Sequence, residues 1–572
     1  MRAENVLAVE VDNRPGPSTI PGWARRLATE RDAWYDWWHY GGIVRDVWLS
    51  VDEGALLRRQ RIRSKVEGQG ASVSDVVFVE NHSKRPLHVK LTLTAWGPDG
   101  AAAARSEKAV TLAPGPQEVP FDLHLDAVRL WRLDDPQLYR MEARLTSHGA
   151  APLDVATDSF GVRTIEIRDR RLYLNGDRVR LSGMTRHEDS PWEGLAESVG
   201  TIVRDYDDLK ALHVTLTRPV HYPQHPAVLD YADRNGILLV PEIPIWQFNE
   251  EQLEDPKVRT LAKQMIREMI EQAGNHPSIF AWSVCNESAT FAPGGVDYVR
   301  TMRELVKSLD ADRYLTYADD SVLNADDPTK TAAVLADFLM VNEYFGSWQG
   351  PAGPLPAKLE RLGRLLPDKM VVISEFGLAS IFESDSASGD RGRVRVIRGQ
   401  MAEFSRHDWI AGAILWCYQD YKSHRNLWPG ETSGYVEMGL VDEHRQRRPS
   451  YDVWQEMNAP ARLAVEWNET YRTPTAFRVT VTPRTESEIP FLPLRGYRVE
   501  WELRDDDDRV VARRSAELPD ADGPRDVAGV WTQTDSKSLR LGFRLLQPDG
   551  RPALDEVLRW RLPRSGEKSG LN

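Results

Sequence analysis

One stretch in the middle of the chain decides its fold class: Ile279-Phe280-Ala281-Trp282-Ser283-Val284-Cys285-Asn286-Glu287. A nearly continuous apolar run of this length is typical of a strand buried on both faces, as in a parallel sheet. Helical patterns precede it at residues 257–273 and follow it at residues 296–309. Strands that alternate with helices in this way predict parallel β–α units.

The same alternation extends over residues 164–460, with further helical patterns at residues 229–234, 355–365 and 393–404. Strands are expected at residues 181–185, 213–218, 237–243, 279–286, 314–318, 338–343, 371–375 and 413–418. Eight parallel strands are the number that closes a (β/α)₈ TIM barrel. The alternative is an open, doubly wound sheet, which would be favoured by a Gly-rich phosphate loop after the first strand. This strand runs into Met184-Thr185-Arg186-His187-Glu188-Asp189 instead, so the barrel is preferred.

The segments on either side of the barrel have the pattern of β-sandwiches. In residues 53–163, short alternating stretches at 76–80, 87–93 and 138–143 are separated by turn signals such as Gly97-Pro98-Asp99-Gly100. Residues 461–572 repeat the pattern at 477–482, 497–503 and 539–544. Both segments are therefore expected to be β-sandwiches of about a hundred residues, the size of immunoglobulin-like domains.

Composition limits the classes of partner. The formal charge is -13, from 86 acidic against 73 basic residues, and this balance argues against nucleic acid, which needs a basic face. No apolar run approaches the ~18 residues of a membrane span. The two cysteines, Cys285 and Cys417, lie in apolar segments and are expected to be buried thiols. No His/Cys cluster has metal-ligand spacing, so neither a metal nor another cofactor is predicted. The sequence leaves open whether the chain forms a homo-oligomer.

The start of the chain shows no secretory signal. The segment Val6-Leu7-Ala8-Val9-Glu10-Val11 alternates like a strand. A cytoplasmic location is therefore favoured, although a chain that opens in mid-strand can lack its true beginning.

Two glutamates stand where barrel strands end, which is where barrels carry their reactive groups. Glu287 follows the fourth strand, and Glu375 ends the seventh in Val371-Val372-Ile373-Ser374-Glu375. Hydrolysis of a glycosidic bond needs a carboxylic acid to protonate the leaving oxygen and a carboxylate at the anomeric carbon. Strands four and seven face each other across the barrel mouth, so a sugar ring would fit between the two side chains. A salt bridge at the rim is the alternative for either glutamate alone.

These motifs resemble glycoside hydrolase family 2, which includes β-galactosidases, β-glucuronidases and β-mannosidases. The similarity extends over nearly the whole chain and is carried by these segments: Asp36-Trp37-Trp38-His39-Tyr40-Gly41-Gly42-Ile43-Val44-Arg45-Asp46-Val47, Leu130-Trp131, Asp135-Pro136-Gln137-Leu138-Tyr139, Phe160-Gly161-Val162-Arg163, Gly183 to Asp189, Arg218-Pro219-Val220-His221-Tyr222-Pro223, Asn286-Glu287 and Ser374-Glu375-Phe376-Gly377. The resemblance implies four parts: residues 1–52 as the C-terminal remnant of a sugar-binding jelly-roll domain, 53–163 as an immunoglobulin-like sandwich, 164–460 as the catalytic barrel and 461–572 as a C-terminal sandwich.

The resemblance also implies the roles of individual residues. Glu375 is the expected nucleophile and Glu287 the expected acid/base of a retaining, exo-acting β-glycosidase with a carbohydrate substrate. The residues expected to bind that substrate are Asp36, His187, Arg218, His221, Asn286, Tyr344 and Trp416. Within this set, Asn286 is expected at the sugar 2-hydroxyl, Tyr344 at the nucleophile and Trp416 beneath the sugar ring, while core packing is the alternative for Trp416.

The substrate is less constrained. Family β-glucuronidases carry an Asn-x-Lys motif after strand eight, whereas this chain reads Asn426-Leu427-Trp428. A β-galactoside is therefore the first expectation and a β-glucuronide the second, with Lys422 or Arg425 as a source of charge. The metal-dependent galactosidases of the family use an acidic residue and a histidine near the acid/base. Of these residues, only Glu188 is evident in this chain. A non-catalytic carbohydrate-binding protein and a transglycosylase remain as other functions.

Overall fold

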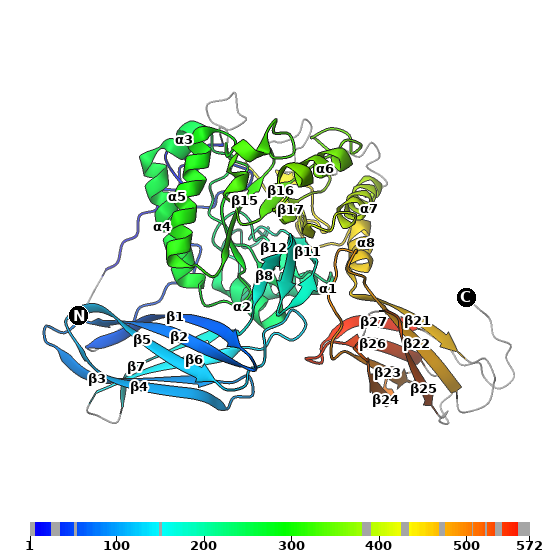
Figure 1. The fold of residues 1–572 in the computed structure, drawn as a ribbon, viewed down its shortest axis with the longest axis horizontal. Helices are drawn as coiled ribbons and strands as arrows, with labels where there is room; N and C mark the ends of the chain where they lie inside the picture. Colours follow the sequence, from blue (N-terminus) through cyan, green and yellow to red (C-terminus); the bar gives the residue numbers. More distant parts are fainter. Residues whose placement is uncertain are drawn as a thin grey trace.

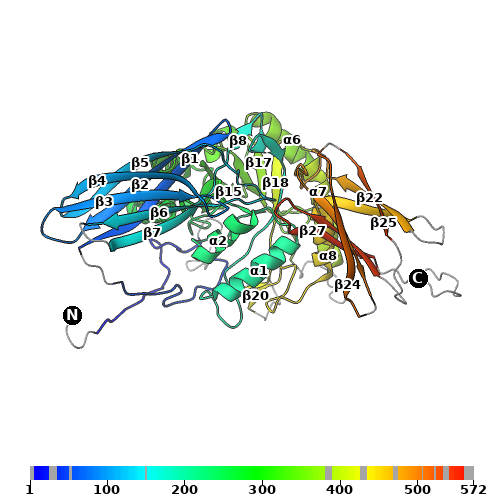
Figure 2. The same ribbon diagram turned by 90° about the horizontal axis from the view of Figure 1, so that it is seen from below.

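The computed structural model describes residues 6–24, 35–50, 54–147, 151–379, 390–424, 434–467, 475–505, 507–520, 523–531 and 540–558 of the 572-residue chain. A barrel forms the centre, and one β-sandwich lies below each of its sides (Figures 1 and 2). Arg425 and Trp428, on which part of the substrate prediction depends, lie outside the described residues.

Eight parallel strands form the barrel: β11 (Leu181–Met184), β12 (Leu216–Thr217), β13 (Leu238–Leu239), β14 (Ala281–Asn286), β15 (Tyr314–Asp319), β16 (Leu339–Asn342), β17 (Val371–Glu375) and β18 (Ile410–Leu415). Their hydrogen-bonded order is β13-β12-β11-β18-β17-β16-β15-β14. Isolated parallel bridges, such as Glu242 to Ser283, join β13 to β14 and complete the ring. The predicted barrel is confirmed, and the open doubly wound sheet was wrong, because the bridges between β13 and β14 leave the sheet without the two free edges that an open sheet has.

Helices surround the strands: α1 (Val199–Ala211), α2 (Pro226–Asn235), α3 (Glu250–Glu254), α4 (Pro256–Ala273), α5 (Pro293–Leu309), α6 (Leu355–Leu365), α7 (Arg391–Ser405) and α8 (Pro449–Asn458), with 3₁₀ turns η1 (Pro328–Lys330) and η2 (Ala332–Val334). The five predicted helices are present. The pattern search missed α1, α3 and α8, although α1 buries Ile202, Tyr206 and Leu209 at helical spacing.

A small sheet closes the lower end of the barrel, opposite the ends that carry the two glutamates. It comprises β8 (Ile165–Arg168), β9 (Arg171–Leu174) and β10 (Asp177–Val179). Leu172, Leu174 and Val179 from this sheet pack into one core with the inward side chains of the barrel strands, including Leu216 and Phe280. The lower end is therefore filled, and only the upper end can receive a ligand.

The N-terminal sandwich has two facing sheets, in the orders β1-β2-β5 and β4-β3-β6-β7. Its strands are β1 (Ala55–Glu67), β2 (Gly70–Asn81), β3 (Leu87–Trp96), β4 (Ala102–Leu112), β5 (Gly115–Leu125), β6 (Tyr139–Thr146) and β7 (Pro152–Phe160). Alternate residues of β5 and β6 are buried, as expected for strands with one face on a core. The predicted immunoglobulin-like sandwich is consistent with this arrangement.

The C-terminal sandwich has the sheets β21-β22-β25 and β24-β23-β26-β27. Its strands are β21 (Ala461–Trp467), β22 (Thr475–Pro483), β23 (Arg498–Arg504), β24 (Val510–Glu517), β25 (Arg525–Trp531), β26 (Arg540–Leu546) and β27 (Pro552–Leu558). Val479, Val499 and Leu545 are fully buried in its core. One further short pair, β19 (Tyr421–Lys422) and β20 (Tyr435–Val436), lies beyond the end of β18.

The described parts of residues 1–52 form neither helix nor strand. The strand predicted from the alternation at Val6 to Val11 was wrong, because a strand needs a hydrogen-bonded neighbour and this segment has none among the described residues. The jelly-roll assignment of residues 1–52 remains a prediction.

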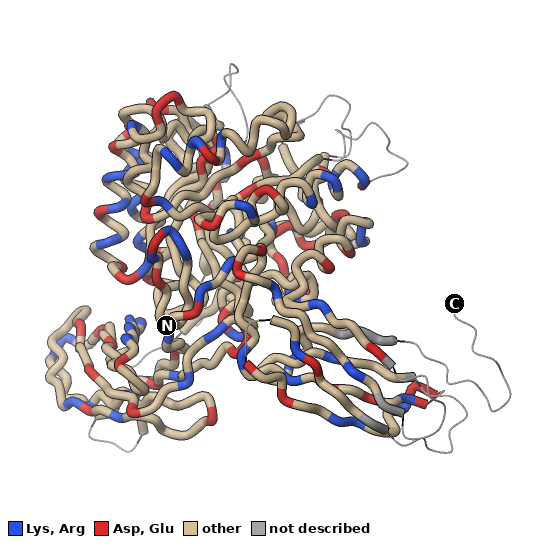
Figure 3. Tube along the Cα trace, turned by 45° about the vertical axis from the view of Figure 1, so that its right-hand side comes forward, with Lys and Arg blue, Asp and Glu red and all other residues tan. Residues whose placement is uncertain are grey.

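Charged residues of both signs are spread over the barrel and both sandwiches (Figure 3). In this view neither sign collects on one domain. Within the described residues, no helix is long and apolar enough to cross a membrane.

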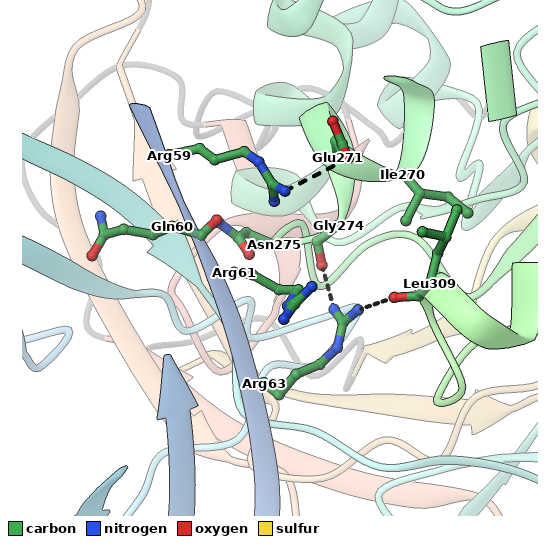
Figure 4. Close-up of a pocket in the computed structure, with 9 residues that line it drawn as sticks. All are labelled: Arg59, Gln60, Arg61, Arg63, Ile270, Glu271, Gly274, Asn275 and Leu309. Atoms are coloured by element: carbon green, nitrogen blue, oxygen red, sulfur yellow. Dashed lines mark hydrogen bonds and ion pairs between the residues drawn. The ribbon is translucent and has the colours of Figure 1, made fainter. Parts of the chain in front are cut away.

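Polar contacts attach the edge strand β1 to helices α4 and α5 of the barrel (Figure 4). Asn275 Oδ1 accepts from the Ile62 N–H (2.9 Å), and Asn275 Nδ2 donates to the Gln60 carbonyl (3.0 Å). Arg63 donates to the carbonyls of Gly274 (3.2 Å) and Leu309 (3.3 Å). Side chains of the barrel thus satisfy backbone groups that an edge strand otherwise exposes.

We expect Asn275→Ala to lower the free energy of unfolding by about 1–3 kcal/mol, because two backbone groups of β1 lose their partners inside an interface. The midpoint of urea-induced unfolding measures the change. Asn324→Ala is the matched control, since Asn324 is exposed, and it should shift stability by less than about 0.5 kcal/mol. Equal midpoints for the two variants would show that Asn275 does not hold β1 to the barrel.

Candidate active site

Glu375, the last residue of β17, is buried at the upper end of the barrel with 4% of its surface exposed. One carboxylate oxygen, Oε1, forms an ion pair with Arg218 Nη2. The other, Oε2, accepts from the Tyr344 hydroxyl at 2.6 Å. The side chain is therefore fixed by two donors, one of which is charged.

Arg218 follows β12 and bonds to most of the polar side chains at the bottom of the site, which form its polar floor. Its Nη1 donates to Glu242 Oε1 (2.7 Å) and to Asn286 Oδ1 (3.3 Å), while its Nη2 contacts Glu375. Glu242 also accepts from Ser283 Oγ (2.8 Å). The Arg218 guanidinium is fully buried, and a buried charge is costly unless it is paired. The guanidinium and the nearby carboxylates therefore compensate each other's charge.

The protonation of Glu375 is set by opposing effects. Burial raises the pKa of Glu375 to about 8, the charge of Glu287 adds to the rise, and Arg218 and the Tyr344 hydroxyl oppose it. For Glu242, burial also acts to raise the pKa, but Arg218 and His221 outweigh it and the net shift is downward. The guanidinium thus lowers the pKa of Glu242 on balance, whereas at Glu375 the effect of burial is larger than that of the same cation.

Glu287 stands directly after β14 with a φ of 46°, in the left-handed region. This conformation costs a residue with a Cβ roughly 1–2 kcal/mol, and such strain is concentrated at functional sites. Each carboxylate oxygen of Glu287 accepts from one amide: Oε2 from Gln247 Nε2 and Oε1 from Asn342 Nδ2, both at 2.9 Å. The structure therefore orients Glu287 as firmly as Glu375, but with neutral donors.

Asn286 Nδ2, Arg218 Nε and His187 Nε2 are among the buried polar atoms of the site that have no hydrogen-bond partner in the described part of the chain. Buried groups of this kind are usually satisfied, so an exception calls for a bound water, ion or ligand. A sugar hydroxyl would satisfy Asn286 Nδ2 and His187 Nε2. Burial lowers the pKa of His187, with further contributions from His221 and Arg218, so its ring is neutral.

Aromatic rings form the walls above this floor. Trp416 follows β18 and lies parallel to His221, with ring centroids 5.3 Å apart. Trp37, from the N-terminal segment, packs at 5.4 Å from His221 and 6.0 Å from Trp246. Tyr421 lies 4.3 Å from His187. Such rings present the apolar faces on which sugar C–H groups pack.

The N-terminal segment is tied across the upper end of the barrel. Asp36 accepts from the hydroxyls of Tyr421 (3.0 Å) and Ser423 (3.1 Å). The Tyr40 hydroxyl donates to Asp189 (2.7 Å), and Arg45 forms an ion pair with Glu188. Residues 35–50 thereby supply one wall of the site, although they belong to a different part of the chain from the barrel.

The structure brings together all nine residues that the sequence singled out, in a network that runs from Asp36 through the aromatic walls to the two glutamates. Their individual roles remain proposals. Sequence reasoning missed further members of the site: Glu242, Gln247, Asn342, Trp37, Trp246 and Tyr421. Only Glu242 and Asn342 gave a signal that could have found them, because they lie in the last two residues of the strands predicted at 237–243 and 338–343.

No group of three or more His, Cys, Asp or Glu side chains suited to a metal ion is found among the described residues. The polar groups of the site are instead bonded to one another and to Arg218. Both cysteines are buried thiols, as predicted.

Models of known protein families match two parts of the chain. The model described as "Glycosyl hydrolases family 2, TIM barrel domain" matches residues 165–386, and "Glycosyl hydrolases family 2" matches residues 56–163. Together the two matches cover more than half of the chain. The chain belongs to glycosyl hydrolase family 2. It is accordingly a glycosidase, an enzyme that hydrolyses O-glycosyl compounds.

Individual relatives within family 2 divide between two substrates. A β-glucuronidase from Paenibacillus borealis is 25% identical over 74% of this chain and 72% of its own length. A β-galactosidase from Thermoanaerobacterium thermosulfurigenes is 26% identical over 80% of this chain and 60% of its own length. Among solved structures, a family 2 β-galacturonidase from Eisenbergiella tayi bound to galacturonate superposes with a TM-score of 0.69 at 24% identity, over 78% of either chain. The last likeness establishes the fold.

The contact between Tyr344 and Glu375 predicts a pH effect. The hydroxyl donates to the ionised carboxylate, so its removal in Tyr344→Phe raises the pKa of Glu375 further. A lost hydrogen bond to a charged group costs ~1.5–3 kcal/mol, so the acidic limb of the kcat/KM profile on a nitrophenyl β-glycoside should move to higher pH by about one unit or more.

Tyr451→Phe is the control, because Tyr451 is equally buried and donates to Asp208 (2.6 Å) from α8, outside the site. This variant should keep the acidic limb of the wild type. An unchanged limb in Tyr344→Phe would show that Glu375 does not set it.

Proposed function

We propose that the chain is a retaining, exo-acting β-glycoside hydrolase, with Glu375 as nucleophile and Glu287 as acid/base. The observation that carries this proposal is the pair of carboxylates held in one network by different donors. Glu375 is bound by a guanidinium and a phenol, and Glu287 by two amides. Two carboxylates with different surroundings are what a division into acid and nucleophile requires.

In the first step, a Glu375 carboxylate oxygen attacks the anomeric carbon while Glu287 gives its proton to the glycosidic oxygen. The bond to the leaving group breaks, and a glycosyl ester forms on Glu375. Arg218 and Tyr344 direct the attacking carboxylate, and Asn286 Nδ2 is free to donate to the sugar 2-hydroxyl, a bond that strengthens in the transition state.

In the second step, Glu287 is ionised and takes a proton from a water molecule that attacks the same carbon. The ester bond breaks, Glu375 returns as a carboxylate and the sugar leaves with the configuration it had in the substrate. Gln247 and Asn342 hold the Glu287 carboxylate in place during this step, because each of its oxygens accepts a hydrogen bond from one of the two amides. The left-handed backbone at Glu287 is difficult to explain in a protein that only binds carbohydrate.

The wall formed by residues 35–50 supports exo action. Asp36, bonded to Tyr421 and Ser423, and Trp37, packed on His221, close the site on one side. A site closed in this way accepts the terminal sugar of a chain and leaves the aglycone outside.

For the terminal sugar we propose a β-linked galactose first. Among the described residues near Asp36, the groups are acceptors and hydroxyls suited to neutral sugar hydroxyls, and the buried cation Arg218 is already paired with Glu242 and Glu375. A β-uronide is the second candidate. Lys422 favours it, because its ammonium lies 4.2 Å from the centroid of the Trp38 ring, and Trp38 is two residues after Asp36. Several relatives are also named β-glucuronidase.

The assignment of acid/base and nucleophile is tested by a pair of variants. We expect Glu287→Ala to retain glycosylation by nitrophenyl glycosides, whose leaving groups need no proton, and to lose it for alkyl glycosides. Azide should restore turnover and yield a β-glycosyl azide, since it attacks the ester without a base.

Glu375→Gln is the matched variant, and it should lose at least ~10³-fold in kcat without rescue by azide, because no ester can form. If azide accelerates neither variant and no glycosyl azide is found with Glu287→Ala, Glu287 is not the acid/base.

A panel of nitrophenyl β-glycosides tests the substrate. We expect the highest kcat/KM for β-galactoside over β-glucuronide and β-galacturonide, and proton NMR should detect the β-anomer of the sugar as the first product. Lys422→Met should lower turnover of a β-glucuronide selectively if the uronide candidate is correct. A first product of α configuration would refute retention, and added alcohol acceptors would reveal any transglycosylation.

A further inference from the structure

A second cavity lies between the barrel and the C-terminal sandwich, away from the site above. Its volume is about 860 Å³, within the range of about 300–1,000 Å³ that ligand pockets occupy. It is lined by the end of α1, by α2 and α8, by β21 and by the turn between β26 and β27. Figure 1 shows α1 and α8 directly above the upper edge of this sandwich. Domain interfaces are a preferred location for ligand sites.

Charged side chains of both signs line this cavity: the cations are Lys210, Arg462, Arg484 and Arg551, and the acids are Asp134, Asp207, Asp452 and Glu456. Lys210, the penultimate residue of α1, shares it with His213, Arg484 and Arg551. Among the described residues, the Lys210 ammonium makes neither an ion pair nor a hydrogen bond. Burial lowers the pKa of Lys210 to about 8, with a further decrease from Arg551, and burial together with Lys210 and Arg484 lowers that of His213 to about 4. Burial and the neighbouring cations therefore both favour the uncharged forms of Lys210 and His213.

The acidic residues closest to Lys210 are already engaged with other cations. Asp549 forms an ion pair with Arg551, and Asp134 forms one with Arg132 at 2.9 Å. Asp207, which lines the cavity together with Asp134, accepts from the Tyr231 hydroxyl at 2.6 Å. The remaining acids of the cavity, Asp452 and Glu456, are exposed on α8.

Neutral polar groups stand beside the cations. Among the described residues, no hydrogen bond of the Gln547 amide or the His213 ring is found, and both line the same cavity. Asn235 Oδ1 accepts from Arg551 Nη1 at 2.6 Å, which directs that guanidinium toward α2. The cavity thus combines an ammonium that lacks a counter-ion with groups that can bind hydroxyls.

We propose that this cavity binds a small, hydroxylated organic anion, whose phosphate or carboxylate group lies against Lys210 and Arg551. The proposal is independent of the glycosidase reaction, because no residue of the cavity belongs to the catalytic network. An anion supplies the counter-charge that the described residues lack, and hydrogen bonds between ionised partners are the strong ones. Lys210 near the C-terminus of α1 also suits the helix dipole, which explains why the ammonium is tolerated when the cavity holds no ligand.

Isothermal titration calorimetry on the full chain tests the site with three probes at constant ionic strength: inorganic phosphate, glucose 6-phosphate and gluconate. We expect saturable binding of one molecule per chain for at least one probe. Binding of both phosphates alone identifies a phosphate site, and binding of gluconate as well identifies a general anion site. Lys210→Met should weaken binding about tenfold or more, as the loss of a hydrogen bond to a charged group predicts. Lys210→Arg should retain binding.

Lys263→Met is the matched control, since Lys263 is exposed on α4, and its affinity should equal that of the wild type. The unfolding temperature of Lys210→Met without ligand should be no lower than that of the wild type, because an unpaired, partly buried ammonium does not stabilise the fold. No saturable heat with any probe, or the same affinity in Lys210→Met and the wild type, would overturn the proposal.

Proton uptake gives an independent readout. An anion stabilises the ammonium form, so binding at pH 8.5 should take up protons onto Lys210, whose pKa in the free protein is about 8. Titrations in two buffers of different ionisation enthalpy measure this uptake. Lys210→Arg should bind without it, because arginine is already charged, and equal uptake in that variant would exclude Lys210 as the group concerned.

Discussion

The guanidinium of Arg218 lies at the centre of the barrel's upper end, and its charge is shared among Glu242, Glu375 and Asn286. Each partner comes from a different strand end, so one side chain couples β12, β13, β14 and β17. Removing one partner from a buried ion pair costs ~3–5 kcal/mol, because the other charge is then left without compensation. The geometry of the catalytic carboxylate and the integrity of the barrel's upper end therefore depend on the same interaction.

From this floor the site is built upward by segments that are distant in sequence. The loop after β13 supplies Gln247 and Trp246, and the N-terminal segment adds Asp36 and Trp37. Strand ends fix the charged groups, which must be positioned closely, whereas loops provide the aromatic walls. This division suits a barrel, because its strands form a rigid frame while its loops are free to define which sugar is accepted.

The attachment of the two sandwiches follows a common physical pattern. Arginine side chains donate to backbone carbonyls of the neighbouring domain: Arg63 to Gly274 and Leu309, and Arg180 to Ser487 at 2.6 Å. Such bonds satisfy carbonyls that lie outside regular ladders without requiring a large apolar interface. The cavity beside Lys210 lies between the barrel and the C-terminal sandwich.

The sequence by itself determined the barrel, because runs such as Ile279 to Asn286 are long, apolar and bounded by helices. It also identified Glu287 and Glu375 as candidate catalytic residues, because barrels carry their reactive groups at strand ends, independently of the conformation of the loops. It did not determine the left-handed backbone of Glu287, which depends on the turn between β14 and the following loop. Nor did the sequence predict that Gln247 and Trp37 belong to the site. A loop or an irregular segment has no periodic pattern from which its contact with a particular strand end could be predicted. Those contacts, and the cavity beside Lys210, were decided by the tertiary structure, because closing the ring and docking the sandwiches bring together side chains whose separation in sequence carries no periodic signal.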